Sequence, residues 1–222
     1  MNFGEELAII EEKLHDLVYN HGNEIHPTHK KHLEEAQIVL DRIILTTKYP
    51  LIILDLNGVL MEKVYMDRKT PNYNKLIVGY LDEKGRPWST VGNHIIRPSV
   101  HGPELLKRLF ESDKRISIWS SGYTSNVVKW LKAIYPMYID QFFFVWGQDK
   151  CTPIPVEEKD ARPILSKPLT TVFDEYPQYN TSNTTIIDDS PQKMEGNDLD
   201  CVIFVTDDDT IDNFKFVTDQ VF

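Results

Sequence analysis

The feature that most constrains the fold is a series of five short apolar runs spread over the later part of the chain. They are "LIILDL", "RISIWSS", "FFFVWG", "TTIIDDS" and "CVIFVT", and each ends at polar or turn-forming residues. Near-continuous apolar runs of this length are typical of parallel strands that are covered on both faces. Between them lie segments with helical spacing, "PELLKRLFES", "TSNVVKWLKAIYP" and "ILSKPLTTVFDEY". This alternation predicts an α/β fold with a doubly wound, Rossmann-like parallel sheet.

Two segments depart from the alternation of strand and helix. Residues 1–48 contain two apolar stripes at helical spacing, separated by "HGNEIHP", and predict an N-terminal helical hairpin. Residues 49–222 then form the α/β domain. Within it, residues 61–98 contain Gly, Pro and alternating apolar positions that suit β-hairpins. We therefore predict a small β insertion after the first strand and no large cap domain.

Charge and apolar length restrict the partners of the chain. The 222 residues have a formal net charge of -10, and an acidic chain repels a phosphate backbone, so we expect no direct nucleic-acid partner. The apolar runs are strand length, too short for a membrane span. The start, "MNFGEELAIIEEKL", lacks the features of a signal peptide, and the two cysteines are far apart. We expect a reduced, intracellular, cytoplasmic monomer; a nuclear or secreted-effector location stays open.

Polar side chains follow three of the predicted strands at the point where each strand ends. Asp55 follows "LIIL", Ser120 follows "ISIW", and the pair Asp188 and Asp189 follows "TTII". In open α/β sheets, ligands bind beyond the carboxyl ends of the strands. A carboxylate after a buried strand is costly unless a cation or a donor meets it, and carboxylate oxygens suit Mg²⁺.

An anion site is predicted beside this acidic group. Ser120 and Ser121 lie just before a predicted helix start, "GYTSNVV", where hydroxyl and backbone N–H groups favour an anion. A cation site next to an anion site describes a site for phosphate. Each motif alone has a simpler explanation: "DLNGVL" fits a plain β-hairpin, and "DDSP" fits a solvated turn. The order and spacing of all three favour the phosphate site.

These motifs together resemble those of the haloacid dehalogenase (HAD) superfamily of phosphatases. Within it, the chain resembles the branch of RNA polymerase II C-terminal-domain phosphatases, also called NLI-interacting-factor domains. The resemblance covers roughly residues 49–205. The matching segments are "LIILDLNGVL" for the first motif, "IIRPSVHGPELLKRL" for an Arg-Pro segment, "ISIWSSGYTSNVV" for the second motif, "RPILSKPL" for the third and "IIDDSPQK" for the fourth.

The resemblance implies a role for each matched residue. Asp55 would attack phosphorus and form an aspartyl phosphate, and Lys167 would stabilise both Asp55 and the phosphate. The implied Mg²⁺ ligands are Asp55, Asn57, Asp188 and Asp189. The implied substrate-binding residues are Ser120, Ser121, Gly122 and Lys167.

The chain departs from the family pattern at Asn57. The family has a second aspartate there, which protonates the leaving oxygen and later activates water, and an amide cannot transfer that proton. General acid–base help is worth about 10²–10⁴ in rate, so the resemblance implies slow turnover. A phenolic oxygen with pKa about 10 needs less proton assistance than an alkyl alcohol, so aryl phosphates such as phosphotyrosine are the expected preference. Asn57 is either the natural residue or a substitution of that aspartate; both interpretations stay open.

Two functions from different classes are compatible with these residues. The first is a Mg²⁺-dependent phosphatase that acts on phosphorylated protein side chains, which suits a site with no large cap. The second is a catalytically impaired module that binds a phosphoprotein or another protein partner, which Asn57 favours. A small-metabolite hydrolase or phosphotransferase is a third interpretation, and the missing cap argues against it.

Overall fold

The computed structural model describes residues 13–15, 30–38, 49–65, 88–156 and 163–205. The chain divides into two units, residues 1–49 and 50–222. In the first unit, residues 13–15 and 30–38 are helical. The rest of the helical hairpin that we predict for residues 1–48 lies outside the described residues, so the hairpin and the domain boundary stay predictions.

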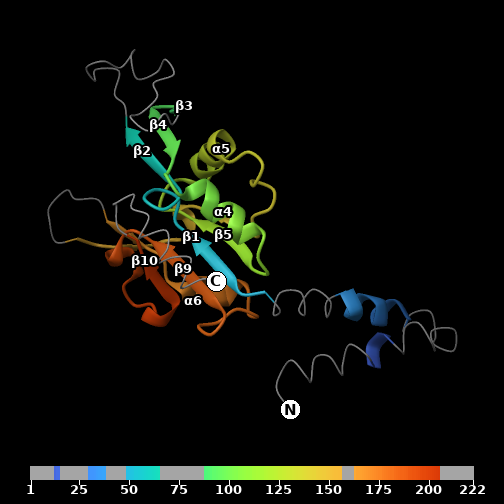
Figure 1. Cartoon of the computed structure of the whole chain (residues 1–222). Helices are drawn as coiled ribbons and strands as arrows, with labels where there is room; N and C mark the ends of the chain where they lie inside the picture. The colour runs from blue at the N-terminus through green and yellow to red at the C-terminus, as the bar shows by residue number, and fades with distance from the viewer. Residues whose placement is uncertain (1–12, 16–29, 39–48, 66–87, 157–162, 206–222) are drawn as a thin grey trace. The chain divides into compact units, whose positions relative to one another are not determined.

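Five parallel strands form the main sheet of the second unit, in the order β10-β9-β1-β5-β6 (Figure 1). Each of the five apolar runs in the sequence contains one of these strands, so the predicted doubly wound parallel sheet is confirmed. The strands are β1 (Leu51–Leu54), β5 (Arg115–Trp119), β6 (Val145–Trp146), β9 (Thr184–Asp188) and β10 (Val202–Phe204).

Strand β1 is the centre of the sheet. Leu54 pairs in parallel with Ile118 of β5 on one side and with Ile187 of β9 on the other. A hairpin would require an antiparallel partner next to β1, so the hairpin interpretation of "DLNGVL" is wrong. The chain instead turns at Gly58 and continues into β2 (Met61–Tyr65), which belongs to a different sheet.

The apolar core lies on both faces of the main sheet, because successive residues of a strand point to opposite sides. Ile52 and Leu54 of β1 pack with apolar residues of α4 and α5, whereas Leu51 and Ile53 pack with those of α6. Figure 1 shows α4 and α6 on opposite sides of β1. The helices are α4 (Gly102–Phe110), α5 (Thr124–Ile134) and α6 (Leu169–Glu175), with 3-10 helices η1 (Gln148–Lys150), η2 (Pro191–Met194) and η3 (Leu199–Cys201).

A small antiparallel sheet follows β1, as the sequence predicts. Its order is β2-β4-β3, with β3 (Ser89–Val91) and β4 (His94–Pro98). No large cap domain is present among the described residues, and residues 66–87 of this insertion lie outside them. None of the helices in the described part of the chain is long and apolar enough to cross a membrane. Cys151 and Cys201 are both free.

The segment "ILSKPLTTVFDEY" is not helical throughout, contrary to our prediction. Its first residues form β8 (Ile164–Ser166), which pairs with β7 (Thr152–Ile154), and α6 begins only at Leu169. Pro168 explains the boundary, because a proline disfavours helical dihedral angles in the residue before it. Lys167 therefore lies in the extended connection between β8 and α6.

Gly58 matters both for the turn after β1 and for the packing of the Asp189 side chain. Its φ is +92°, and a Cβ atom there would lie 2.0 Å from Oδ2 of Asp189. Gly92 offers a matched comparison with φ +61°, where no atom of the described residues lies within 4 Å of the position that a Cβ atom would take. Both glycines have a left-handed backbone, but only at Gly58 is there also no room for a side chain.

We expect Gly58→Ala to lower the free energy of unfolding more than Gly92→Ala does. The left-handed backbone costs an L-residue about 1–2 kcal/mol at either position. Only at Gly58 does the new methyl group also collide with Asp189, which adds about 1–3 kcal/mol of overpacking. Urea unfolding of the two variants measures the difference. An equal loss of unfolding free energy in the two variants would show that the Asp189 side chain moves aside without cost.

Candidate active site

A buried lysine joins two carboxylates at the carboxyl ends of neighbouring strands. Asp55 directly follows β1 and Asp188 ends β9, so the parallel pairing of these strands brings the two side chains together. Nζ of Lys167 donates to Oδ1 of Asp55 at 2.8 Å and to Oδ2 of Asp188 at 2.5 Å. Asp55 is 1% exposed, and Lys167 and Asp188 are fully buried. Charges buried this deeply persist only because they are paired.

A third carboxylate completes an acidic cluster. Asp189 joins Asp55 and Asp188, and each of the three offers an oxygen within 4.8 Å of the others. Ser190 orders two of these groups: its backbone N–H donates to Asp188 Oδ1 at 2.8 Å, and its hydroxyl donates to Asp189 Oδ1 at 2.7 Å. Hard carboxylate oxygens gathered at this spacing fit the donor set that Mg²⁺ prefers. These residues could therefore hold a divalent cation.

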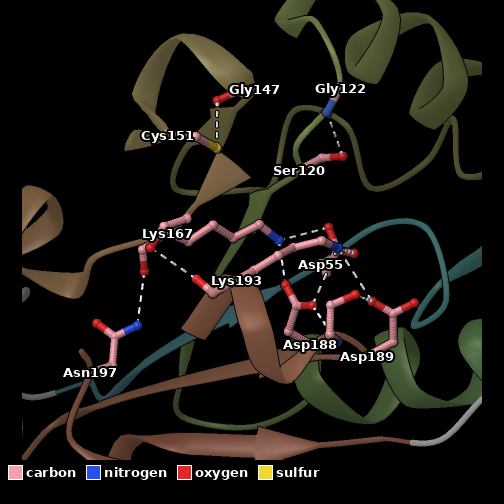
Figure 2. Close-up of polar contacts among 12 residues, drawn as sticks. Asp55, Ser120, Gly122, Gly147, Cys151, Lys167, Asp188, Asp189, Lys193 and Asn197 are labelled. Carbon is pink, nitrogen blue, oxygen red and sulfur yellow. Dashed lines mark hydrogen bonds and ion pairs between the residues drawn. The ribbon is translucent and has the colours of Figure 1, made fainter. Parts of the chain in front are cut away.

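A second lysine approaches the same cluster, and our sequence analysis did not identify it. Nζ of Lys193 lies 3.5 Å from Asp55 Oδ2 and 3.5 Å from Asp188 Oδ1. It also lies 3.4 Å from Asp189 Oδ1, and Figure 2 shows it pointing toward this group from η2. Burial opposes the charged form, but the three carboxylates together raise the pKa of Lys193 above its ordinary value. Its position four residues after Asp189 in "DDSPQK" was the available signal.

The backbones that carry the two lysines are hydrogen bonded to each other. The N–H of Lys167 donates to the carbonyl of Lys193 at 2.9 Å, and the Ser166 hydroxyl donates to the same carbonyl at 3.2 Å. The Asn197 side chain donates to the carbonyl of Lys167 at 3.0 Å and accepts from the N–H of Leu169 at 2.7 Å. Lys167 is thus fixed at both of its backbone groups, and Asn197 is a positioning residue that the sequence did not reveal.

The predicted phosphate-binding residues lie at the same edge of the sheet. Ser120 follows β5, the neighbour of β1, and is 4% exposed. Its hydroxyl accepts a hydrogen bond from the N–H of Gly122 at 3.3 Å, and Ser121 and Gly122 are half-buried. Within the described residues, no hydrogen bond or ion pair joins these three to the acidic cluster. Their part in phosphate binding stays a prediction.

Asn57 contains an unused hydrogen-bond acceptor. Its side-chain oxygen is buried, and no partner for it lies among the described residues. Leaving a buried polar atom unpaired is costly, typically about 1–3 kcal/mol, so such atoms call for an explanation. An acceptor two residues after Asp55 is compatible with the predicted role of Asn57 as a metal ligand.

A third lysine, in the β insertion, interacts electrostatically with the site. Burial and the nearby Lys193 lower the pKa of Lys63 in β2, and Asp55 opposes the change. Nζ of Lys63 also lies 4.6 Å from the ring centroid of Trp130. The charge of Lys63 thus interacts favourably with that of Asp55 and unfavourably with that of Lys193. The sequence pattern of β2 gave no indication of it.

Cys151 also lies near the site but is not an activated nucleophile. Its Sγ contacts the carbonyl oxygen of Gly147 at 3.8 Å (Figure 2). Burial raises the pKa of this thiol, although the positive charges of Lys167 and Lys193 act in the opposite direction. A thiol with a raised pKa stays protonated, and the thiolate is the nucleophilic form.

Solved structures that are similar to this chain include two of Fcp1. One is described as Fcp1, an essential RNA polymerase II CTD phosphatase, with 16% identity and a TM-score of 0.48 over 82% of this chain and 51% of that one. The other is fission yeast Fcp1 bound to beryllium fluoride, with 15% identity and a TM-score of 0.44 over 81% of this chain and 53% of that one. The chain thus spans about half the length of these proteins. No curated protein sequence is significantly similar to it.

The family model for the NLI interacting factor-like phosphatases matches residues 50–213. The matched segment makes up most of the chain and contains every residue of the site described above. The resemblance noted in the sequence is therefore confirmed, and the chain belongs to the NLI interacting factor-like phosphatase family.

Proposed function

We propose that the protein is a Mg²⁺-dependent phosphate monoester hydrolase that acts through an aspartyl phosphate on Asp55. One observation carries the proposal: Asp55 is buried at the end of the central strand, held by Lys167 and next to the two carboxylates Asp188 and Asp189. A carboxylate in this position is a nucleophile with a cation already beside it. A purely structural carboxylate would have no need for the surrounding acids.

The chemistry has two steps at Asp55. In the first, a carboxylate oxygen of Asp55 attacks phosphorus, a new P–O bond forms, and the bond to the leaving oxygen breaks. In the second, water attacks the phosphorus of the aspartyl phosphate, which releases inorganic phosphate and restores the carboxylate. Because Lys167 already contacts Oδ1 of Asp55, its ammonium group lies where it can offset charge on the transferring oxygens.

The metal and the phosphate would be held by different groups of residues. Asp55, Asn57, Asp188 and Asp189 would hold Mg²⁺, which supplies positive charge to the phosphoryl oxygens when it is bound. Lys167, Ser120, Ser121 and Gly122 would bind the phosphate. The start of α5 at Thr124 supports this, because the N–H groups at the start of a helix favour an anion.

The proposed substrate is a phosphorylated side chain of a protein. Among the described residues, only the small sheet β2-β4-β3 follows β1 where a cap would be inserted. Tyr123, adjacent to Gly122, is 64% exposed and could contact a large substrate. Asn57 favours an aryl phosphate such as phosphotyrosine, since a phenolic oxygen leaves with little proton assistance. A monomeric, intracellular protein without nucleic-acid or membrane partners stays a prediction.

A phosphoprotein-binding module without turnover is the second candidate. Asn57 favours it, because this side chain cannot serve as a general acid or base. The paired Asp55, Lys167 and Asp188 argue against it: a binding module gains nothing from a buried nucleophile, and replacing a buried ion pair by apolar residues is often neutral or stabilising. The hydrolase is the better supported function.

We expect the protein to release phosphate from p-nitrophenyl phosphate when Mg²⁺ is present and to stop when EDTA removes the metal. Asp55→Asn should lower the rate to background because the nucleophile is lost. Asp174→Asn is the matched control, since Asp174 is exposed on α6, and it should keep the parent rate. Phosphate release is measured over a range of Mg²⁺ concentrations. A folded protein with no activity in any Mg²⁺ concentration would favour the binding module.

We expect Asn57→Asp to accelerate hydrolysis of alkyl phosphates more than that of aryl phosphates. The new carboxyl group can protonate the leaving oxygen, which is worth about 10²–10⁴ in rate for a poor leaving group and less for a phenol. The measurement compares kcat/KM for phosphoserine and phosphotyrosine peptides of the same sequence. Asn180→Asp, at an exposed turn before β9, is the control and should change neither value. An equal gain for both peptides would contradict the proposed role of Asn57.

A further inference from the structure

The two lysines of the site contact the carboxylates in different ways. Lys167 pairs with one oxygen of Asp55 and one of Asp188. Lys193 approaches the other oxygen of each, Asp55 Oδ2 and Asp188 Oδ1, and also Asp189 Oδ1. Among the described residues, only Lys193 has a cationic group within ion-pair distance of all three. It therefore lies in the middle of the group that would bind the metal.

The distances show that Lys193 is shared among its partners. Nζ of Lys193 lies 3.4–3.5 Å from each of its three oxygens, whereas Nζ of Lys167 lies 2.5 and 2.8 Å from its two. The Lys193 side chain is 20% exposed, and that of Lys167 is fully buried. Lys193 is thus the more loosely held of the two cations and the one that solvent reaches.

The three carboxylates that would bind a magnesium ion are the same three that the Lys193 ammonium group contacts. Mg²⁺ binds oxygen at about 2.0–2.1 Å and demands near-octahedral geometry. An ammonium group within 3.5 Å of the same three carboxylates would then lie close to a divalent cation, with strong repulsion at low dielectric. One of the two cations has to leave the centre of the cluster.

We propose that the Lys193 ammonium group takes the place of the divalent cation in the metal-free protein, and that Mg²⁺ binds only by displacing it. The inference rests on the proposed metal-dependent function and adds a competing internal cation to it. Lys193 keeps the three carboxylates together when no metal is bound and weakens the affinity of the site for Mg²⁺. The backbone hydrogen bond between Lys193 and Lys167 keeps the displaced side chain next to the site.

Calorimetric titration of Mg²⁺ into metal-stripped protein without substrate tests this competition. Lys193→Met should bind Mg²⁺ about tenfold more tightly than the parent or better, a change of about 1.4 kcal/mol. Lys150→Met is the matched control, because Lys150 pairs with Glu175 and has the same charge. Its Mg²⁺ affinity should stay within about twofold of the parent value, as expected for a salt-screened charge whose ion-pair partner, Glu175, lies outside the acidic cluster.

A further variant shows that the titration reports on this site. Asp189→Asn removes one carboxylate of the cluster and should weaken Mg²⁺ binding in both the parent and the Lys193→Met backgrounds. An unchanged or weaker affinity in Lys193→Met would overturn the proposal. So would Mg²⁺ binding that does not respond to Asp189→Asn. Because no substrate is added, these outcomes are independent of whether the protein hydrolyses phosphate esters, so failure of the proposed hydrolase activity is recognised separately.

Thermal unfolding provides a second measurement. In EDTA, Lys193→Met should have a lower Tm than the parent, because Lys167 pairs only with Asp55 and Asp188, and Asp189 loses the ion pair it makes with Lys193. Saturating Mg²⁺ should raise the Tm of the variant by more than that of the parent, since tighter binding to the folded state gives more stabilisation. If Lys193→Met does not fold, Lys193→Gln replaces it in both measurements. An equal Mg²⁺-induced rise in Tm for parent and variant would count against the competition.

Discussion

The ion pairs of Lys167 with Asp55 and Asp188 are the interaction on which the site depends. All three side chains are almost completely removed from water, and removing one partner of such a group typically costs about 3–5 kcal/mol because the others keep a buried, unpaired charge. The pairs join the central strand β1, the neighbouring strand β9 and the connection between β8 and α6. Asp55, the proposed nucleophile, is therefore positioned by contacts between distant parts of the chain, and local turn geometry alone would not fix it.

The parallel sheet provides the first level of positioning and short backbone contacts provide the second. Because β1 and β9 run in register, Asp55 and Asp188 emerge side by side at the same edge. The extended backbone before Pro168 then directs Lys167 into this edge, and Asn197 fixes its carbonyl group. A helix continuing through Lys167, as the apolar spacing suggested, would have turned its backbone N–H away from the carbonyl of Lys193. Pro168 thus affects the position of Lys167 as well as the start of α6.

The strand ends were predictable from sequence, whereas the lysine contacts were not. Apolar runs bounded by polar residues locate β1, β5 and β9, and parallel pairing then implies that Asp55 and Asp188 meet. Lys167 was identified only through a family resemblance, since it lies 112 residues from Asp55. Lys193 lies 138 residues from Asp55, and its approach depends on the 3-10 turn after Pro191. The spacing of four residues from Asp189 was a local signal for Lys193, but no local pattern encodes the contact of either lysine with Asp55, because that partner belongs to another element.

Asn57 and Lys193 change the charge of the site in the same direction. With aspartate at position 57, four carboxylates together with Lys167 and one divalent cation would carry a net charge of −1. The three carboxylates and two lysines found here carry the same net charge with no metal bound. The amide of Asn57 removes one negative charge from the cluster, and the Lys193 ammonium group adds one positive charge. Together they replace the two positive charges that a divalent cation would supply in the family pattern. This equality gives a physical reason for the metal-free cluster to be stable, and under the competition proposed above Lys193 would lower the affinity of the cluster for Mg²⁺.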